Sequence, residues 1–341
     1  MKYPPDYSFY QFLKGNACFQ KEGYAGRYDL DRLPSPDFRR LLQKVQKVLN
    51  LSLISELPIP EHKSHHPFHV DFIDSAITNA LAFTDGEYSF IGLTMPLIET
   101  ILDVCARLSS SAAIAAAIGV QLSGEESYAL QALLFEMILL FVVAHEYTHH
   151  VHGHLSSSDG DMVPLRQVLA DGDSGSMEEQ IHEIGADSYA AYHLMGNWIG
   201  GARRSEAANL LKIDSALTNK LEETIFSCVV VAVGGFMLLR PLRKLDGDTI
   251  YKLEHPPTGA RLNFFMLTAV GWCEPERTNL KVWMTNERFL GLLASVAEVL
   301  WVPDDERYKD WAAQTEFLRS PDGATYLRKL QAGLDEYKAA L

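Results

Sequence analysis

Five histidines fall within ten positions at the end of the most hydrophobic stretch of the chain, FVVAHEYTHHVHGH at residues 141–154. Three of these residues, His145, Glu146 and His149, form the pattern His-Glu-x-x-His. On an α-helix, positions four apart lie about 40° apart around the axis and one turn along it, so the two rings can converge on one ion. Glu146 lies beside them, where a metal-bound water needs a general base. The pattern therefore predicts a hydrolytic metal site.

The surroundings of this motif favour a buried site over a chance match. Apolar residues that precede it at helical spacing share one face with both histidines, and they are Leu134, Ile138, Phe141 and Val142. We therefore expect the rings of His145 and His149 to point into the interior. Buried imidazoles without partners are costly, so a shared metal ion explains them better than core packing does.

A catalytic zinc ion generally takes three protein ligands, so a third must lie elsewhere in the chain. The segment HEIGADSYAAYH at residues 182–193 contains Glu183 and Asp187, which are four apart and share a helix face. We expect Glu183 to bind the metal, and Asp187 to accept the outer N–H of a ligand histidine and so fix its tautomer. Small residues would let this helix approach the first one closely: Gly185, Ala186, Ala190 and Ala191.

The other histidines of the cluster have different predicted roles. His152 shares the face of the motif but lies a further turn along, which makes it the alternative third ligand. Gly153 is of a residue type that ends helices, so we expect His150, His152 and His154 to cap the helix or to surround the site. A second histidine cluster, at residues 62–69, is expected to be a solvated loop rather than another metal site.

The motif and the second segment together resemble a known family. His-Glu-x-x-His at residues 145–149, followed by Glu-x-x-Ala-Asp at 183–187, is similar to the gluzincin metallopeptidases, in particular the CAAX prenyl endopeptidases and HtpX-like proteases. NALAF at 79–83 and IGLT at 91–94 are similar to the Asn-Ala edge strand of that family. HPPTGARL at 255–262 is similar to its downstream His-Pro and Arg segment.

The resemblance covers residues 79–262 and implies roles for several residues. Asn79 and Ala80 would bind a peptide substrate by strand addition, with an ordinary covered edge strand as the alternative. His255 or Arg261 would donate a hydrogen bond to the developing oxyanion. Tyr189 and Tyr192 are further choices for this donor, and His255 has the alternative role of packing beside a Pro-Pro helix start.

The chain also departs from this family. It has an alanine-rich segment at residues 109–120 before the active-site helix, and it lacks the paired membrane spans of many members. These differences shift the comparison toward soluble bacterial relatives, among which the phage-exclusion Lit-type peptidases have a similar His-Glu-x-x-His.

The expected mechanism is hydrolysis of a peptide bond assisted by Zn²⁺. Zinc lowers the pKa of its bound water and polarises the substrate carbonyl, while Glu146 takes the proton and later delivers it to the leaving nitrogen. A zinc-bound regulatory or sensor protein without turnover is the first alternative. A helical protein with a chance motif is the second, and Glu183 with Asp187 argues against it.

Composition narrows the class of partner. A formal net charge of -14 and the absence of a dense basic run argue against nucleic acid as a partner, since phosphate binding needs clustered Lys and Arg.

The cysteines indicate a reducing compartment, because the four of them lie far apart without Cys-x-x-Cys spacing: Cys18, Cys105, Cys228 and Cys273. Prolines and an aspartate in MKYPPDYSFYQF leave no apolar export signal, so we expect a cytoplasmic protein. Residues 225–239 are uncharged, and we expect a buried core helix there, with a membrane anchor as the alternative.

Local patterns place the elements around the motif. Ser35 and Pro36 indicate the start of a surface helix, and Ser176 with Glu179 forms a predicted capping box. Asp85-Gly86 suits a two-residue type I′ turn, so residues 79–84 are expected to pair with 87–94 as a hairpin. A long apolar helix is expected over residues 127–152, and the Ser, Gly and Asp-rich residues 155–176 are expected to be an exposed excursion.

These elements predict an α+β fold that is mostly helical and zincin-like. The small sheet, with its hairpin near residues 79–94, is expected to pack beside the active-site helix. We expect an N-terminal segment at 1–70 packed on the core, a metallopeptidase core at 71–272 and a helical support at 273–341.

Overall fold

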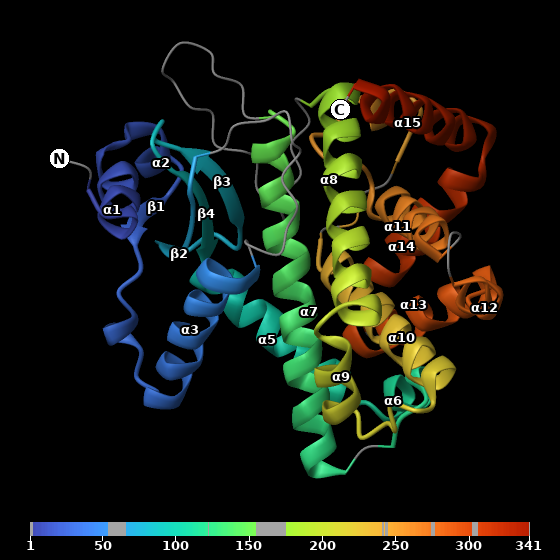
Figure 1. Ribbon diagram of the computed structural model, residues 1–341. Helices are drawn as coiled ribbons and strands as arrows, with labels where there is room; N and C mark the ends of the chain where they lie inside the picture. Colours follow the sequence, from blue (N-terminus) through green and yellow to red (C-terminus); the bar gives the residue numbers. More distant parts are fainter. Residues whose placement is uncertain are drawn as a thin grey trace. The chain divides into compact units, whose positions relative to one another are not determined.

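A computed structural model describes residues 3–53, 66–121, 123–154, 175–240, 242, 245–273, 277–301 and 306–340 of the chain. Helices predominate among them and accompany one four-stranded mixed sheet, which confirms the predicted α+β class (Figure 1). The strands are β1 (Tyr24–Arg27), β2 (Phe68–Ser75), β3 (Ala80–Thr84) and β4 (Ser89–Thr94).

The helices, in chain order, are α1 (Pro5–Gly15), α2 (Ala17–Lys21), α3 (Pro36–Val48), α5 (Met95–Ser109), α6 (Ala112–Ile118), α7 (Gly124–Val151), α8 (Met177–Met195), α9 (Arg204–Leu210), α10 (Thr218–Met237), α11 (Thr258–Cys273), α12 (Thr278–Trp283), α13 (Asn286–Leu300), α14 (Glu306–Arg319) and α15 (Pro321–Ala340). Short 3-10 or π turns lie at Leu30–Arg32, Leu49–Leu53, Gly196–Gly200 and Ile250–Lys252.

Two predicted helix starts are confirmed by their capping hydrogen bonds. The Ser35 side chain accepts from the N–H of Phe38, and Pro36 is the first residue of α3. Ser176 and Glu179 form the reciprocal capping box of α8. Both starts depend on residues within one turn of each other, which is why local sequence predicts them.

The chain divides into two compact units that are each built from separate segments. The described parts of residues 1–100 and 142–170 form the first unit, and those of 101–141 and 171–341 form the second. Helices α5 and α7 contribute residues to both units. The predicted boundaries near residues 70 and 272 stay a prediction.

The first unit is organised by the sheet, whose strand order is β1-β2-β4-β3. Strands β2 and β4 run parallel, from Phe68 opposite Ser89 to Ile73 opposite Thr94, and the other pairs are antiparallel. A cluster of buried aromatic and aliphatic side chains from α1, α2 and the sheet forms its core: Phe9, Leu13, Phe19, Tyr24, Ile73, Leu81, Phe83 and Phe90.

The hairpin of β3 and β4 is confirmed, but its predicted two-residue turn is wrong. Thr84 pairs with Ser89, so four residues form the loop. The Asp85 carboxylate accepts from the N–H groups of Glu87 and Tyr88, and Gly86 has a positive φ of 87°. These side-chain bonds satisfy the loop backbone and allow a wider turn than a type I′ pair.

The last turns of α7 pack on this sheet within the first unit. The ring of Tyr147 lies 4.6 Å from that of Phe68 on β2, measured between centroids. The Nε2 atom of His150 lies 2.9 Å from the Phe90 carbonyl oxygen on β4. The sheet therefore lies beside the helix that carries the histidine motif, as predicted.

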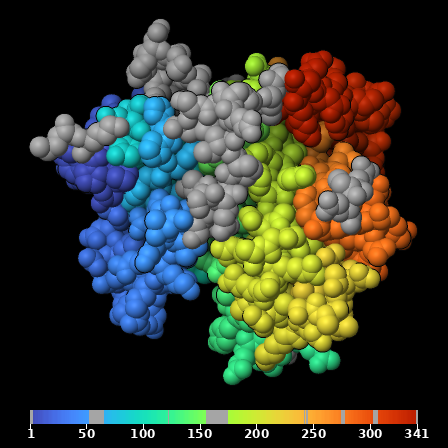
Figure 2. Space-filling view, viewed as in Figure 1, coloured from blue at the N-terminus to red at the C-terminus, as the bar shows by residue number. Residues whose placement is uncertain are grey.

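The second unit is helical, and α8 packs in it against α11 and α15. Their shared core is apolar and includes Ile184, Ala260, Phe264, Tyr326, Leu330 and Leu334. Helix α15 also lies at the surface of this unit, where it is red in Figure 2. The predicted uncharged segment at 225–239 lies mostly in α10, whose side chains are buried from Thr224 to Met237, in agreement with a core helix.

One helix of the described residues, α7, is long and apolar enough to cross a membrane by length and composition. Its most apolar window is 67% buried inside the protein, which fits the core helix of a soluble protein. Helices α5 and α6 meet the same criteria only when they are taken together, and they are bent by 78°.

Candidate metal centre

Helix α7 holds the His-Glu-x-x-His motif in a buried position. His145, Glu146 and His149 are exposed by only 5%, 2% and 1% of their surfaces. The expected single apolar face was too narrow a description, because residues on the other sides of the helix, such as Leu140 and Val143, are buried as well. Because α7 is buried on all sides from Met137 to His149, no solvent satisfies the polar side chains there, and the motif must find its partners inside the protein.

The rings of His145 and His149 face each other. Their Nε2 atoms lie 3.1 Å apart, and their ring centroids are separated by 4.9 Å. Two nitrogens bound to one tetrahedral zinc ion, each at about 2.0–2.1 Å, would lie about 3.3 Å apart. The helix therefore holds this pair of nitrogens near the spacing that a shared ion requires.

Helix α7 ends in a way that brings a further histidine to this pair. Gly153 has a positive φ of 74°, its N–H bonds to the His150 carbonyl, and the N–H of His154 bonds to the His149 carbonyl. This is a Schellman motif, in which the second residue past the helix end contacts the residue five positions before it. The Nδ1 atoms of His154 and His149 lie 2.9 Å apart as a result.

His154 thus contacts the outer nitrogen of a predicted ligand, a role that we expected for Asp187. Two sequence features could have predicted this contact, the histidine cluster and Gly153. A helix that ends at a glycine brings a side chain from before its end into contact with one from after it. His152 has a ring contact with His154 at 5.8 Å between centroids, and among the described residues it is not part of the candidate ligand group.

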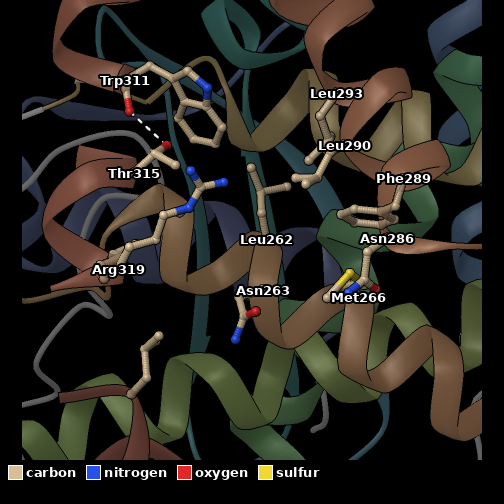
Figure 3. A pocket seen from close by; sticks show the side chains of 13 residues that line it. Leu262, Asn263, Met266, Asn286, Phe289, Leu290, Leu293, Trp311, Thr315 and Arg319 are labelled. Atoms are coloured by element: carbon tan, nitrogen blue, oxygen red, sulfur yellow. Dashed lines mark hydrogen bonds between the residues drawn. The ribbon is translucent and has the colours of Figure 1, made fainter. Parts of the chain in front are cut away.

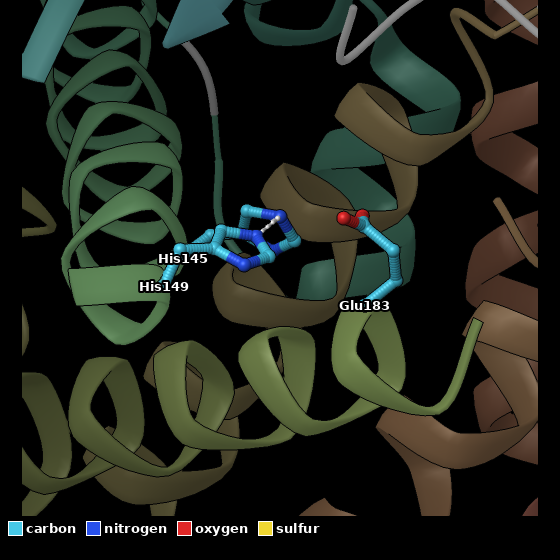
Figure 4. A group of neighbouring side chains, drawn as sticks. All are labelled: His145, His149 and Glu183. Carbon is cyan, nitrogen blue, oxygen red and sulfur yellow. Dashed lines mark hydrogen bonds between the residues drawn. The ribbon is translucent and has the colours of Figure 1, made fainter. Parts of the chain in front are cut away.

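Glu183 completes a group of three buried residues that offer metal ligands. It lies on α8 and is 8% exposed. One ligand atom from each of His145, His149 and Glu183 lies within 4.8 Å of the other two (Figure 4). Two imidazoles and a carboxylate are a donor set that suits zinc, and a three-ligand site leaves a position for water. The three predicted metal ligands are therefore close enough to share an ion.

Asp187 and Arg261 form a buried ion pair in the second unit. The Arg261 Nε and Nη2 atoms each donate to an Asp187 carboxylate oxygen at 2.6 Å. Their exposed fractions are 2% and 1%. This bidentate contact joins α11 to α8, so the structure gives Arg261 a protein partner in the place of the substrate contact that the sequence suggested.

His255 lies beside the third candidate ligand. Its Nε2 atom is 3.6 Å from a carboxylate oxygen of Glu183, and the residue is 2% exposed. An imidazole at this distance can orient the carboxylate or donate a hydrogen bond to a substrate oxygen nearby. The structure brings the sequence-predicted His255 to the ligand group, although their positions are 72 residues apart (255 − 183).

Asn79 has partners within the first unit. Its amide donates to the Tyr24 hydroxyl at 2.8 Å, while its main chain is bonded to Thr94. Burial raises the pKa of Tyr24 to about 12, with the negative charge of Glu146 as a smaller cause in the same direction. Tyr24 thus stays protonated near the predicted base. Sequence reasoning missed it, because no local pattern connects position 24 to positions 79 and 146.

Strand β3 is the edge strand that the resemblance implied, and it is covered. Residues from Ala80 to Phe83 are at most 2% exposed, even though β3 has only β4 as a neighbour in the sheet. This burial favours the alternative of a covered edge strand. Strand addition by a substrate at Ala80 stays a prediction.

Gly185 was expected to let α8 approach the active-site helix closely. A Cβ there would lie 2.8 Å from the Tyr337 ring of α15, so this glycine makes room for α15. His69 was expected in a solvated loop, but it lies on β2 with Asp71 at 3.3 Å, and Asp71 also pairs with Arg27 at 2.6 Å. His62, His65 and the excursion after His154 lie outside the described residues.

Comparison with known proteins gives no further identification. No family model, no curated protein and no solved structure matches this chain.

Proposed function

We propose that this chain is a zinc metalloendopeptidase of the gluzincin type, related to the CAAX prenyl endopeptidase and HtpX-like group. The observation that carries the proposal is the convergence of His145, His149 and Glu183 with Glu146 next to the first ligand. A purely structural zinc site has four protein ligands and no use for an adjacent carboxylate base.

The residues present suit the separate tasks of amide hydrolysis, which are metal binding and proton transfer. His145, His149 and Glu183 would hold Zn²⁺, which when bound polarises a substrate carbonyl and lowers the pKa of water. Glu146 accepts one proton from the attacking water and transfers it to the amine nitrogen as the C–N bond breaks. The water oxygen remains in the new carboxylate, so the reaction needs no covalent intermediate with the chain.

His255 is proposed as the residue that donates to the substrate oxyanion. It lies at the Glu183 side of the ligand group and is buried, and a donor in a site that excludes water is worth more than one in bulk solvent. Arg261 is proposed to support the site through Asp187, because its Nε and Nη2 atoms already donate to that carboxylate.

We further propose that the protein acts in the cytoplasm on protein or peptide substrates. The described cysteines form no disulfide, and the net charge of -14 disfavours nucleic acid as a partner. Burial of α10 and α7 supports a soluble protein, in which residues 225–239 serve the core.

The test combines metal analysis with proteolysis by the full chain. Wild type, Glu146→Gln and Glu125→Gln are purified, their zinc content is measured, and each is incubated with a proteome-derived peptide library. We expect one zinc per chain in all three, with cleavage by wild type and Glu125→Gln and a loss of about 100-fold or more in Glu146→Gln. Glu125 is the matched control because it is an exposed glutamate on the same helix.

The outcomes separate the proposal from its alternatives. Zinc in all three proteins without cleavage by any of them would favour the sensor. Cleavage that survives in Glu146→Gln would rule out Glu146 as the base, and a wild-type chain that binds no zinc would overturn the proposal as a whole.

A further inference from the structure

A groove in the second unit lies between four helices, α11, α13, α14 and α15 (Figure 3). Its volume is about 270 Å³, just below the range of roughly 300–1,000 Å³ that is typical of pockets for drug-sized ligands. The groove therefore suits a small ligand. Nothing in the proposed peptidase mechanism uses it.

The walls of the groove are mainly apolar. Leu262, Phe289 and Leu293 are each at most 3% exposed, while Leu290 at the rim is 49% exposed. Met266 and Trp311 complete these walls. An apolar chain placed there would cover carbon surface that is now open to water, at about 25 cal/mol for each Å² buried.

A single cation lies at this apolar groove. Arg319 is the exposed last residue of α14, and Figure 3 shows its guanidinium group on the side that faces Leu262. Among the residues that the structure describes, no carboxylate pairs with it. The neighbouring Thr315 hydroxyl is engaged, since it donates to the Trp311 carbonyl at 2.9 Å. The groove therefore offers a positive charge that the described protein does not neutralise.

Two amide side chains add polar contacts at the edges of the groove. Asn263 is on α11 and Asn286 is the first residue of α13, and within the described ranges neither side chain has a hydrogen-bond partner. The start of α13 is already capped, because the Thr285 side chain accepts from the N–H of Arg288, and Glu287 lies in its first turn. The positive charge at the groove therefore comes from Arg319.

We propose that the groove binds a small amphipathic monocarboxylate, an unbranched medium-chain acyl anion such as octanoate. The carboxylate pairs with the Arg319 guanidinium, whose planar fork matches two carboxylate oxygens, and the acyl chain covers Leu262, Met266 and Phe289. A dianion or a sugar would leave either charge or hydroxyl groups against these apolar walls. The inference does not rest on the peptidase function.

The test is calorimetric titration of the full chain with octanoate, butyrate and octanol. We expect saturable binding of octanoate, with octanol and butyrate each at least about tenfold weaker, because one lacks the charge and the other most of the apolar chain. Arg319→Gln should weaken octanoate about tenfold and leave octanol unchanged. Arg328→Gln, an exposed arginine on α15 outside the groove, is the matched control and should bind octanoate like wild type.

A cavity-filling variant checks the location. Met266→Trp should abolish octanoate binding while thermal unfolding shows that the protein is still folded. Octanoate binding that is unchanged in both Arg319→Gln and Met266→Trp would overturn the assignment. The assignment would also be overturned if octanoate showed no saturable binding to wild type. Binding only of a peptide that ends in a free leucine carboxylate would overturn it as well.

Discussion

His154 illustrates how a single ring nitrogen can control a metal ligand. If His149 presents Nε2 to the ion, its Nδ1 carries the proton and needs an acceptor, and the Nδ1 atom of His154 lies 2.9 Å away. That contact requires His154 to be neutral with its proton on Nε2. Partners of this kind orient a ligand ring and typically change metal affinity by 10–100-fold.

We therefore expect His154→Ala to weaken zinc binding by about 10–100-fold. His154→Asn should restore most of the affinity, because its Oδ1 atom lies where the histidine Nδ1 lay and can accept the same proton. Competition with a coloured chelator measures the affinity, and His152→Ala on the same turn is the control. Equal affinity in wild type and His154→Ala would contradict the role of His154 without affecting that of His145, His149 and Glu183.

Arg261 and Asp187 allow a second prediction at the residue scale. Removal of one member leaves a buried charge without its partner, so Arg261→Ala should lower the free energy of unfolding by about 3–5 kcal/mol. Arg261→Lys should recover only part of it, because an ammonium group cannot reproduce the two parallel bonds. Urea unfolding measures both effects, and the double variant with Asp187→Leu tests their coupling.

A substrate-binding Arg261 would behave differently. In that case Arg261→Ala would lower kcat/KM and leave the free energy of unfolding unchanged, which is the outcome that the sequence resemblance alone implies.

The sequence predicted His145, His149 and Glu183 because their spacing or segment signature is informative. It could not predict the partner of Asp187, since that contact joins residues 74 positions apart (261 − 187) on separate helices.

At the scale of elements, the end of α7 connects backbone conformation to the metal site. Gly153 and Gly86 have positive φ values of 74° and 87°, and a Cβ at either position would meet nothing within 4 Å. An alanine at either site therefore acts through backbone strain alone, at about 1–2 kcal/mol. Only Gly153 lies next to a histidine that contacts the ligand pair.

We expect Gly153→Ala and Gly86→Ala to destabilise the protein to a similar extent, but only Gly153→Ala to weaken zinc binding. Strain relief at Gly153 would open the turn that holds His154 against His149. Thermal unfolding of the zinc-free proteins and a zinc titration at neutral pH give the two readouts. If both variants lose the same stability and neither loses zinc affinity, the helix end has no part in ligand positioning.

The elements differ in how far the sequence predicted them. Helix starts at Ser35 and Ser176 follow from hydrogen bonds within one turn, and both predictions are confirmed. The hairpin was found but not its loop, because the Asp85 side chain competes with the main-chain bonds of a tight turn. Burial on all sides of α7 from Met137 to His149 was missed, since it depends on neighbours that no local periodicity specifies.

At the scale of the whole molecule, pH acts through net charge and through buried groups in opposite directions. Acid reduces the net charge of -14 and with it the self-repulsion of the folded chain. Buried histidines oppose this effect, because protonation favours the unfolded chain, in which the ring is hydrated. The effect of net charge can be predicted from composition. The effect of buried histidines requires the structure, in which His193 is partly buried in the second unit and contacts the ring of Tyr189.

His193 provides the clearest pH prediction. Burial lowers its pKa from 6.5 to about 4 in the folded protein, so the unfolded chain binds this proton first as the pH falls. The neutral ring makes its full contribution to the free energy of unfolding above pH 6.5. This contribution is lost as the pH falls from 6.5 to about 4, up to a total of about 3 kcal/mol. At pH 5 the loss should be at most about 2 kcal/mol.

We expect His193→Gln to reduce the difference in unfolding free energy between pH 7 and pH 5 by about that amount. Urea unfolding is measured with a chelator present, so that zinc release does not contribute. His66→Gln, at an exposed position of the first unit, should retain the pH dependence of wild type. Since burial also lowers the pKa of the partly buried His182, the wild-type slope alone is not diagnostic. An identical slope in wild type and His193→Gln would show that the His193 ring is hydrated in the folded protein.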